Sequence, residues 1–114
     1  MSNPGRRIPV TLYHDTFVCW IEAAVTKHGI SLELWDEDEG YPEMFADLIR
    51  LPGSGRPNTG CVDVNNFPWA IRVIEDYGLG KPTGMIRESN WCRYPEYEFD
   101  LDKLAEYAYE AEEG

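Results

Sequence analysis

Positive charge is scarce in this sequence. It has 10 Lys and Arg residues against 21 Asp and Glu residues, which gives a formal net charge of −11 at pH 7 over 114 residues. Nucleic acids and anionic membranes both attract basic surfaces, so this balance argues against direct binding to either. It favours instead a protein partner that has a basic surface, or simply high solubility.

Cysteine is also scarce. The three cysteines, Cys19, Cys61 and Cys92, are widely spaced, and no two of them form a C-x-x-C pair. This pattern is typical of neither a zinc site nor a disulfide framework. We therefore expect three free thiols in a reducing compartment, and we predict no metal or other cofactor.

Long apolar runs are absent. The apolar stretch after Arg6 and Arg7 is interrupted by His14, Asp15 and Glu22, so it matches neither a signal peptide nor a membrane-spanning segment. The sequence predicts a cytoplasmic protein.

The residues that are present suffice for one small domain. Hydrophobic residues make up 43% of the chain and aromatic residues 13%, enough for a modest core without disulfides. We predict a single domain over residues 1–114, with a flexible start at 1–8 and an exposed Gly/Pro loop at 51–60.

Alternating apolar residues predict strands in the first half of the chain. Residues 9–13 are expected as an edge strand because they begin with Pro9, and residues 29–36 and 43–51 as the two strands of a hairpin. Residues 16–25 fit both a helical spacing and a strand alternation. The strand is preferred because the segment is rich in β-branched and aromatic residues.

The second half predicts two helices. A short strand at 61–64 precedes a helix at about 66–78, which Asn65 or Asn66 can cap. Its apolar stripe consists of Ala70, Val73, Ile74 and Tyr77. Residues 78–84 are interpreted as a turn-rich connection.

The chain then predicts an edge strand at 93–99, because it contains Pro95, and a C-terminal helix at about 100–111. Asp100 can cap this helix, and the residues expected to face the core are Leu101, Leu104, Ala105 and Ala108. The expected fold class is α+β, with a mostly antiparallel sheet of four to five strands, one internal helix and a C-terminal helix.

Three motifs carry a resemblance to a known family. They are Asn65-Asn66-Phe67-Pro68 after the strand with Asp63, Tyr77-Gly78-Leu79-Gly80 followed by Pro82-Thr83-Gly84, and the run from Trp91 to Pro95. With a weaker match from residue 29 onward, residues 29–104 resemble small proteins of conjugative elements and phages, known as a domain of unknown function. The resemblance implies a mobile-element origin, no known enzymatic activity and no catalytic residue.

Acidic residues gather in two clusters. The first lies at the turn of the predicted hairpin, where the candidate binding residues are Asp36, Glu37, Asp38 and Glu39. The second lies on the C-terminal helix, where Asp102, Glu106 and Glu110 recur every four residues and share one face. Like charges at this spacing repel, and acidic residues near a helix C-terminus oppose its dipole. Both a binding surface and a merely solvated face remain open interpretations.

Aromatic residues supply further candidates. Trp91, Tyr94 and Tyr97 lie among the acidic residues near the C-terminus and are candidate binding anchors. Core packing remains the alternative for each of them.

No motif indicates a reaction. A cysteine could meet His14 or His28 in space, but no oxyanion signature or third orienting group accompanies them. Residues 36–40 lack the twelve-residue spacing of a calcium loop, and residues 78–84 lack the ending of a phosphate-binding loop. The chain is therefore expected to be non-enzymatic.

These observations lead to one expected function and one alternative. The first is a phage or mobile-element protein whose acidic, aromatic-bearing surface occupies the basic, nucleic-acid-binding surface of a host defence protein. It would act as an inhibitor of anti-CRISPR or anti-restriction type, in the manner of a DNA mimic. The alternative is an oligomerising structural or accessory module of conjugation or virion assembly. The sequence does not predict the oligomeric state.

Overall fold

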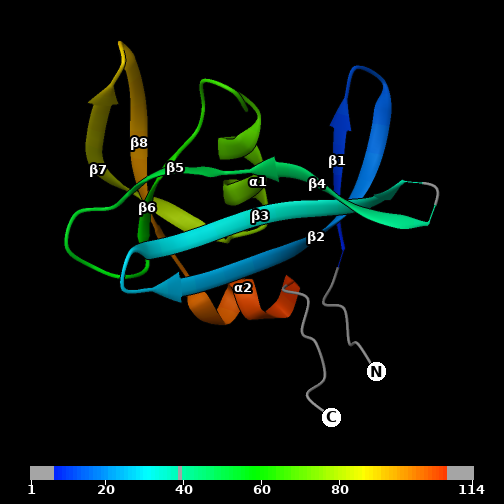
Figure 1. The fold of residues 1–114 in the computed structure, drawn as a ribbon, viewed down its shortest axis with the longest axis horizontal. Helices are drawn as coiled ribbons and strands as arrows, with labels where there is room; N and C mark the ends of the chain where they lie inside the picture. The colour runs from blue at the N-terminus through cyan, green and yellow to red at the C-terminus, as the bar shows by residue number, and fades with distance from the viewer. Residues whose placement is uncertain (1–6, 39, 108–114) are drawn as a thin grey trace.

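The computed structural model describes residues 7–38 and 40–107, which form two antiparallel sheets of four strands each and two short helices (Figure 1). The first sheet has the order β1-β2-β3-β4 and consists of β1 (Ile8–Leu12), β2 (Asp15–Thr26), β3 (Gly29–Asp38) and β4 (Tyr41–Asp47). The second has the order β5-β6-β8-β7 and consists of β5 (Ile49–Pro52), β6 (Thr59–Val62), β7 (Gly80–Ser89) and β8 (Cys92–Phe99). The helices are α1 (Ala70–Asp76) and α2 (Leu101–Tyr107). The predicted α+β class and the C-terminal helix are confirmed.

β2 changes its pairing partner halfway along its length. Residues 15–19 pair with β1, and residues 20–26 pair with β3. The preferred strand at 16–25 is therefore confirmed, with Cys19 and Ile21 fully buried. Because β1 pairs only with the first part of β2, the β1–β2 hairpin projects from the body as an arm (Figure 1).

The strand predicted at 43–51 is divided between the two sheets. β4 ends at Asp47 and β5 begins at Ile49, with the fully buried Leu48 between them. The Leu48 N–H donates to the Leu32 carbonyl at 2.9 Å, which ties the crossing point to β3. With this division, the described residues form eight strands in two sheets, whereas the sequence predicts four to five strands in one sheet.

Part of the predicted connection at 78–84 belongs to an edge strand, β7. A bulge between Pro82 and Ile86 accommodates the extra residues there, including Gly84 at φ +91°. Proline and glycine are typical of turns, so Pro82 and Gly84 lead the sequence to predict a turn where the structure has a strand.

β8 was expected at an edge and lies instead between β6 and β7. Its proline is tolerated there because β6 pairs only with Glu96, Tyr97 and Glu98 of β8. Pro95 lies just beyond the end of β6, where a missing N–H removes no ladder hydrogen bond on that side.

α1 is shorter than predicted and has no side-chain cap; its N-cap residue is Trp69. Asn66 instead closes the preceding turn, since its backbone N–H and its side-chain amide donate to the Asp63 carboxylate at 3.2 and 2.8 Å. Most of the predicted apolar stripe is buried, namely Ala70, Val73 and Ile74, whereas Tyr77 is half-buried.

α2 begins as predicted, because the Lys103 N–H donates to the Asp100 carboxylate at 3.1 Å. Leu104 is buried as expected, but Leu101 and Ala105 are exposed, which corrects their assignment to the core. Tyr107 is the other buried residue of α2. It lies three positions after Leu104, on the face of the helix that packs against β2. Ala108 and the rest of the predicted helix lie outside the described residues.

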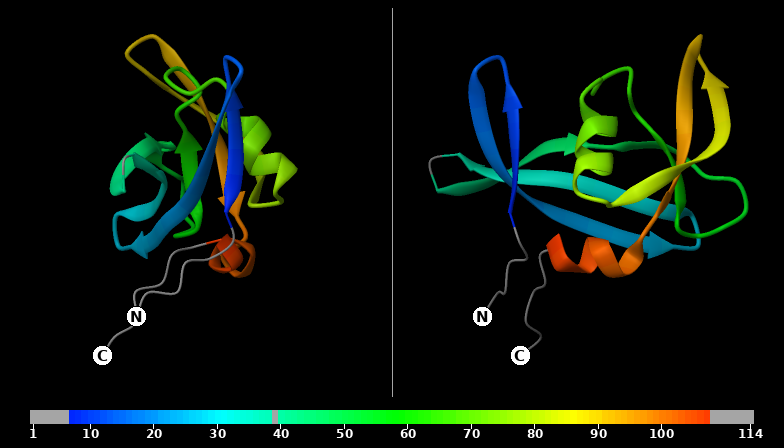
Figure 2. Two further views of the ribbon diagram at one scale, coloured as in Figure 1. Left: turned by 90° about the vertical axis from the view of Figure 1, so that its right-hand side faces the viewer. Right: turned by 180° about the vertical axis from the view of Figure 1, so that it is seen from behind.

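The predicted exposed loop is confined to residues 53–58, since Thr59 and Gly60 are buried in β6. Of the predicted flexible start, residues 1–6 lie outside the described part of the chain, and Ile8 is fully buried in β1. The core lies between the sheets and the helices. In Figure 2, α1 lies between the β1–β2 arm and the β7–β8 hairpin, with α2 below β2.

Candidate functional site

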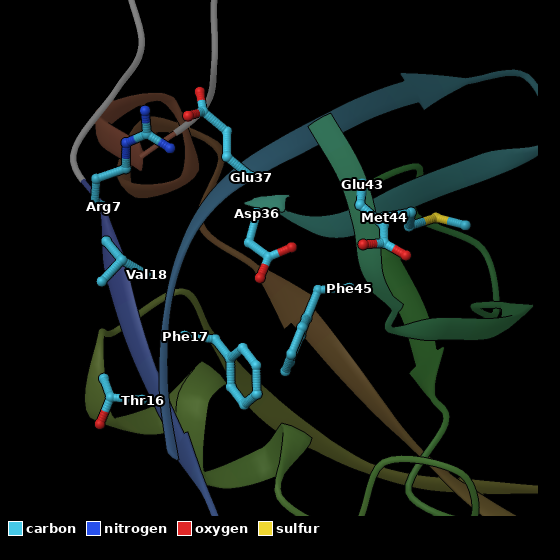
Figure 3. Close-up of a pocket in the computed structure, with 9 residues that line it drawn as sticks. All are labelled: Arg7, Thr16, Phe17, Val18, Asp36, Glu37, Glu43, Met44 and Phe45. Carbon is cyan, nitrogen blue, oxygen red and sulfur yellow. The ribbon is translucent and has the colours of Figure 1, made fainter. Parts of the chain in front are cut away.

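A concavity lies between the β1–β2 arm and the β3–β4 hairpin (Figure 3). Its volume is about 750 Å³, and its lining combines acidic and apolar side chains: Arg7, Thr16, Phe17, Val18, Asp36, Glu37, Glu43, Met44 and Phe45. This volume lies in the range of pockets that hold ligands or anchor side chains. We call this site the acidic concavity.

A bulge in β4 shapes the floor of the acidic concavity. Leu34 is opposite Ala46 and Trp35 is opposite Met44, which leaves Phe45 as the extra residue. A bulge of this kind redirects a side chain relative to the regular alternation. Phe45 packs against Phe17 of β2, with the ring centroids 4.9 Å apart.

The two floor phenylalanines continue into a chain of aromatic contacts. Phe45 also contacts Trp69 at the start of α1, with ring centroids 5.7 Å apart, and Trp69 contacts Phe67 at 5.6 Å. Tilted pairs at these distances add about 0.5–1.5 kcal/mol each beyond the area they bury. The floor is therefore anchored to β2 and β4 of the first sheet and to the start of α1.

Three carboxylates surround this floor. Asp36 follows Ile30, Leu32 and Leu34 at alternate positions of β3, so it lies on the face that is apolar elsewhere. Glu43 lies directly opposite Asp36 across the β3–β4 ladder. Like charges in that position destabilise a sheet. Glu37 and the cation Arg7 complete the rim, so the lining has an excess of negative charge.

The other face of the same sheet carries a second line of carboxylates. Glu22, Glu33 and Asp47 lie opposite one another on β2, β3 and β4. Burial raises the pKa of Asp47, a hydrogen bond from the Ile49 N–H opposes this shift, and the nearby Glu33 and Asp63 raise it further. Trp35 partly offsets the charge on Glu33 by donating its indole N–H to that carboxylate at 3.0 Å. The first sheet is thus acidic on both faces.

The predicted acidic residues fall into separate places. Asp36 and Glu37 line the acidic concavity, whereas the Asp38 side chain and Glu39 lie outside the described residues. Asp102 and Glu106 are exposed on α2, where Glu106 pairs with Lys103 at 3.2 Å. Glu110 lies outside the described part of the chain.

The three predicted aromatic anchors differ in exposure. Trp91 is fully exposed at the tip of the β7–β8 hairpin. Tyr94 and Tyr97 are buried, at 4% and 3% exposure, and so cannot serve as surface anchors. They are buried because both faces of β8 are covered; Tyr97 packs against Phe99, and its hydroxyl donates to the Glu75 carboxylate.

Sequence reasoning missed the apolar half of the site. Phe17, Met44 and Phe45 line the acidic concavity but were assigned only to strands. Only Asp36 could have indicated the site. It follows three buried apolar residues at alternate positions of β3, and a charged residue in such a position indicates that this face of the strand is no longer covered by the core. No local sequence pattern predicts the bulge at Phe45.

The described residues offer little support for covalent or metal chemistry. Burial and, to a smaller extent, the nearby Asp36 raise the pKa of the Cys19 thiol to about 12, against the opposing effect of Arg7. Burial also raises the pKa of Cys61, so both sites disfavour the thiolate that acts as a nucleophile. Cys19, Cys61 and Cys92 are free thiols, as predicted. Within the described residues, no His, Cys, Asp and Glu side chains cluster in a way that could hold a metal ion.

One buried carboxylate has a structural role. Glu96 in β8 accepts hydrogen bonds from the backbone N–H and the hydroxyl of Ser54, both at 2.8 Å, and from the Thr83 hydroxyl at 2.9 Å. Burial alone would raise the pKa of Glu96, but these hydrogen bonds and the nearby Arg87 lower it below its ordinary value. The carboxylate joins the 53–58 loop to the bulge of β7.

The architecture is that of a small α+β domain with two antiparallel sheets and an acidic concavity at one end. The chain belongs to the DUF4313 family, a domain of unknown function whose model matches residues 21–113. The predicted resemblance to an uncharacterised family is thereby confirmed. Searches of curated proteins and of solved structures found no match. Of the helices described, neither has the length and apolar character needed to cross a membrane.

Proposed function

We propose that this protein is a non-enzymatic binding protein that docks onto a basic surface of another protein through the acidic concavity. The observation that carries the proposal is the convergence of Asp36, Glu37 and Glu43 around the phenylalanine floor. Carboxylates bind an arginine or lysine head group through charge-assisted hydrogen bonds, and an aromatic floor packs against its aliphatic stem or guanidinium plane.

The cross-strand pair of Asp36 and Glu43 supports the proposal independently. Directly opposed carboxylates cost a sheet up to about 1 kcal/mol, so folding alone does not favour this arrangement. A cationic partner relieves the repulsion on binding. The net charge of −11 acts in the same direction, because it accelerates encounter with a basic surface.

The finer form of the proposal names the partner and the origin. The partner is a nucleic-acid-binding defence protein or complex of the host, which the chain inhibits in the cytoplasm by occupying its basic surface. The chain then acts for a phage or conjugative element, in anti-CRISPR or anti-restriction fashion. The acidic composition and the family resemblance support this form.

The test is capture of a partner from a host-cell lysate by the tagged protein, with identification by mass spectrometry. Exchanging Asp36→Lys and Glu43→Lys should abolish capture, whereas the control Asp102→Lys with Glu106→Lys makes the same charge change on α2 and should reduce capture less. Raising the salt concentration should also weaken capture, because it screens exposed charges. Unchanged capture by the concavity variant at low and high salt would overturn the proposal.

A further inference from the structure

The tip of the β7–β8 hairpin is strained and exposes a large aromatic side chain. The two-residue turn consists of Asn90 at φ 50° and Trp91 at φ 68°, both in the left-handed region. A non-glycine residue there costs about 1 kcal/mol or more, and glycine is the usual occupant of such turns. Trp91 is 104% exposed, so no contact within the described residues compensates for this cost. Strain of this kind is characteristic of functional positions.

The β7–β8 hairpin that carries Trp91 has further exposed apolar and charged residues. Met85 and Ile86 of β7 are also exposed, at 54% and 50%. The exposed charges of the hairpin are mainly cationic, namely Lys81, Arg87 and Arg93 against Glu88. Glu88 pairs with Arg93 at 3.4 Å, but both side chains are well exposed. The ion pair is therefore weak, and Arg93 can form an ion pair with another carboxylate instead. We call this hairpin the basic arm.

The molecule itself carries the complementary surface. The β1–β2 and β3–β4 hairpins, whose residues line the acidic concavity, lie at the other end of the molecule from the basic arm, as Figures 1 and 2 show. The acidic concavity combines acidic rim residues with an aromatic floor, which matches a protruding tryptophan that has Arg93 beside it. The two surfaces are too far apart to meet within one chain, because they belong to different sheets at opposite ends.

Pairing of sheet edges is an unfavourable route to association. The edge strands β1, β4, β5 and β7 each contain one proline, at Pro9, Pro42, Pro52 and Pro82. Proline removes a backbone donor from an edge, and it is one of the ways in which proteins prevent strands of two molecules from pairing. These prolines disfavour edge-to-edge pairing at β1, β4, β5 and β7, so side-chain surfaces are the more favourable route to self-association.

We propose that the basic arm of one copy inserts Trp91 into the acidic concavity of a second copy. The inference rests on the proposed function, because it gives the same concavity a second occupant. Arg93 meets the carboxylates of Asp36 and Glu43, and the indole packs against Phe17 and Phe45. Arg87 is not part of this contact, because its guanidinium donates to the Pro52 carbonyl at 2.8 Å. The two surfaces differ, so the contact is heterologous and joins molecules head to tail, or closes as a reciprocal pair.

The test uses sedimentation of the purified protein over a range of concentrations. We expect reversible association with a Kd on the order of 100 µM at low salt, as for a small interface with one aromatic anchor. Trp91→Gly should weaken it at least about tenfold, since buried tryptophans dominate such contacts. Glycine suits the positive φ of this turn, so the variant should fold at least as well as wild type.

Tyr13→Gly is the matched control. Tyr13 lies in the two-residue turn of the β1–β2 arm at φ 50°, and it is 95% exposed. The variant thus removes an equally exposed aromatic residue from an equivalent turn outside the basic arm. It should associate as wild type does. Equal loss of association in both variants would overturn the assignment to Trp91, and so would a wild-type protein that stays monomeric at about 1 mM.

A charge exchange tests the pairing of the two surfaces. Glu43→Lys and Arg93→Glu should each weaken association. An equimolar mixture of the two variants should restore it, because the wild-type arm of the first variant fits the wild-type concavity of the second, and the altered arm of the second is complementary in charge to the altered concavity of the first. The double variant Glu43→Lys with Arg93→Glu has two altered but complementary surfaces and should recover association. Failure of this recovery would overturn the proposed pairing.

The same variants separate this inference from the proposed function. Trp91→Gly leaves the acidic concavity intact, so it should capture the host partner as well as wild type or better, because it lacks the competing occupant. Glu43→Lys should lose both activities. A monomeric wild-type protein that still needs Glu43 for capture would overturn only the self-association.

Discussion

Two residues occupy positions where another residue would favour folding. Asp36 occupies a core-facing position of β3 although an apolar residue would pack there, and Trp91 occupies a turn position that suits glycine. Neither choice stabilises the fold. Glu96 is the opposite case, because its burial is fully compensated by three hydrogen bonds.

Replacing Glu96 with Gln should destabilise the protein in a pH-dependent way. The pKa of Glu96 is lowered in the folded state, so its carboxylate stabilises the fold above its ordinary pKa of about 4.3. That contribution is lost as the pH falls through the lower folded-state pKa. Glu96→Gln should therefore cost about 1.5–3 kcal/mol at pH 7, and the difference from wild type should shrink below about pH 4.

Thermal unfolding between pH 3 and 7 measures this effect. Glu98→Gln is the control on the same strand, because it removes only the ion pair with Arg56 at 3.0 Å. Arg56 is largely exposed, so the loss should stay below about 1 kcal/mol. A constant difference between wild type and Glu96→Gln over the whole range would show that the charge of Glu96 is not the stabilising feature.

A second residue-scale prediction concerns strain at the tip of the basic arm. Trp91→Gly should raise the free energy of unfolding by about 1 kcal/mol, because glycine adopts positive φ without the steric cost. Chemical denaturation measures the change. Trp91→Ala keeps the strain and should bring no such gain, so equal stability of the two variants would contradict the explanation.

At the scale of elements, sequence patterns were most informative where burial is one-sided. The alternation in β2 and β3 and the stripe of α1 predicted these elements because a half-buried strand or helix repeats with a fixed period. β7 was partly missed, because its bulge needs Gly84 and its edge tolerates Pro82. Tyr94 and Tyr97 were misassigned because β8 is covered on both faces, and no local pattern reveals which strand becomes central.

The concavity was only partly predictable for the same reason. Asp36 and Glu37 stand out as charges at the end of a strand. Phe17 and Phe45 come together only through the partner change in β2 and the bulge in β4. Both features depend on how the strands pair in the folded protein, so neither can be predicted from the spacing of apolar residues in either segment.

The helices allow a matched test of core assignment. Ile74 of α1 is fully buried, so Ile74→Ala should cost about 2–5 kcal/mol. Leu101 of α2 was expected in the core but is 47% exposed, so Leu101→Ala should cost less than about 1 kcal/mol. Denaturant titration of both variants checks the assignment. A larger loss for Leu101→Ala than for Ile74→Ala would contradict it.

At the scale of the whole molecule, charge is distributed unevenly along the two sheets. The first sheet ends in the acidic concavity, and the second sheet ends in the basic arm. Lys27 and Arg56 lie near that second end, at a pocket between the β2–β3 turn and the 53–58 loop. The protein thus combines a large net negative charge with a strong charge asymmetry, which orients it as it approaches a charged partner.

The two acidic surfaces should affect different steps of partner binding. α2 lies below β2, apart from the β1–β2 and β3–β4 hairpins at the end of the first sheet (Figure 1), whose residues line the acidic concavity. Asp102→Lys with Glu106→Lys alters exposed charges outside the proposed contact, so it should mainly slow association, and increasingly so at low salt. Phe45→Ala removes part of the contact floor without changing charge, so it should mainly speed dissociation. Surface plasmon resonance with the captured partner separates the two rates. If Phe45→Ala changes neither rate while the α2 variant changes both, the contact lies on α2 and not in the acidic concavity.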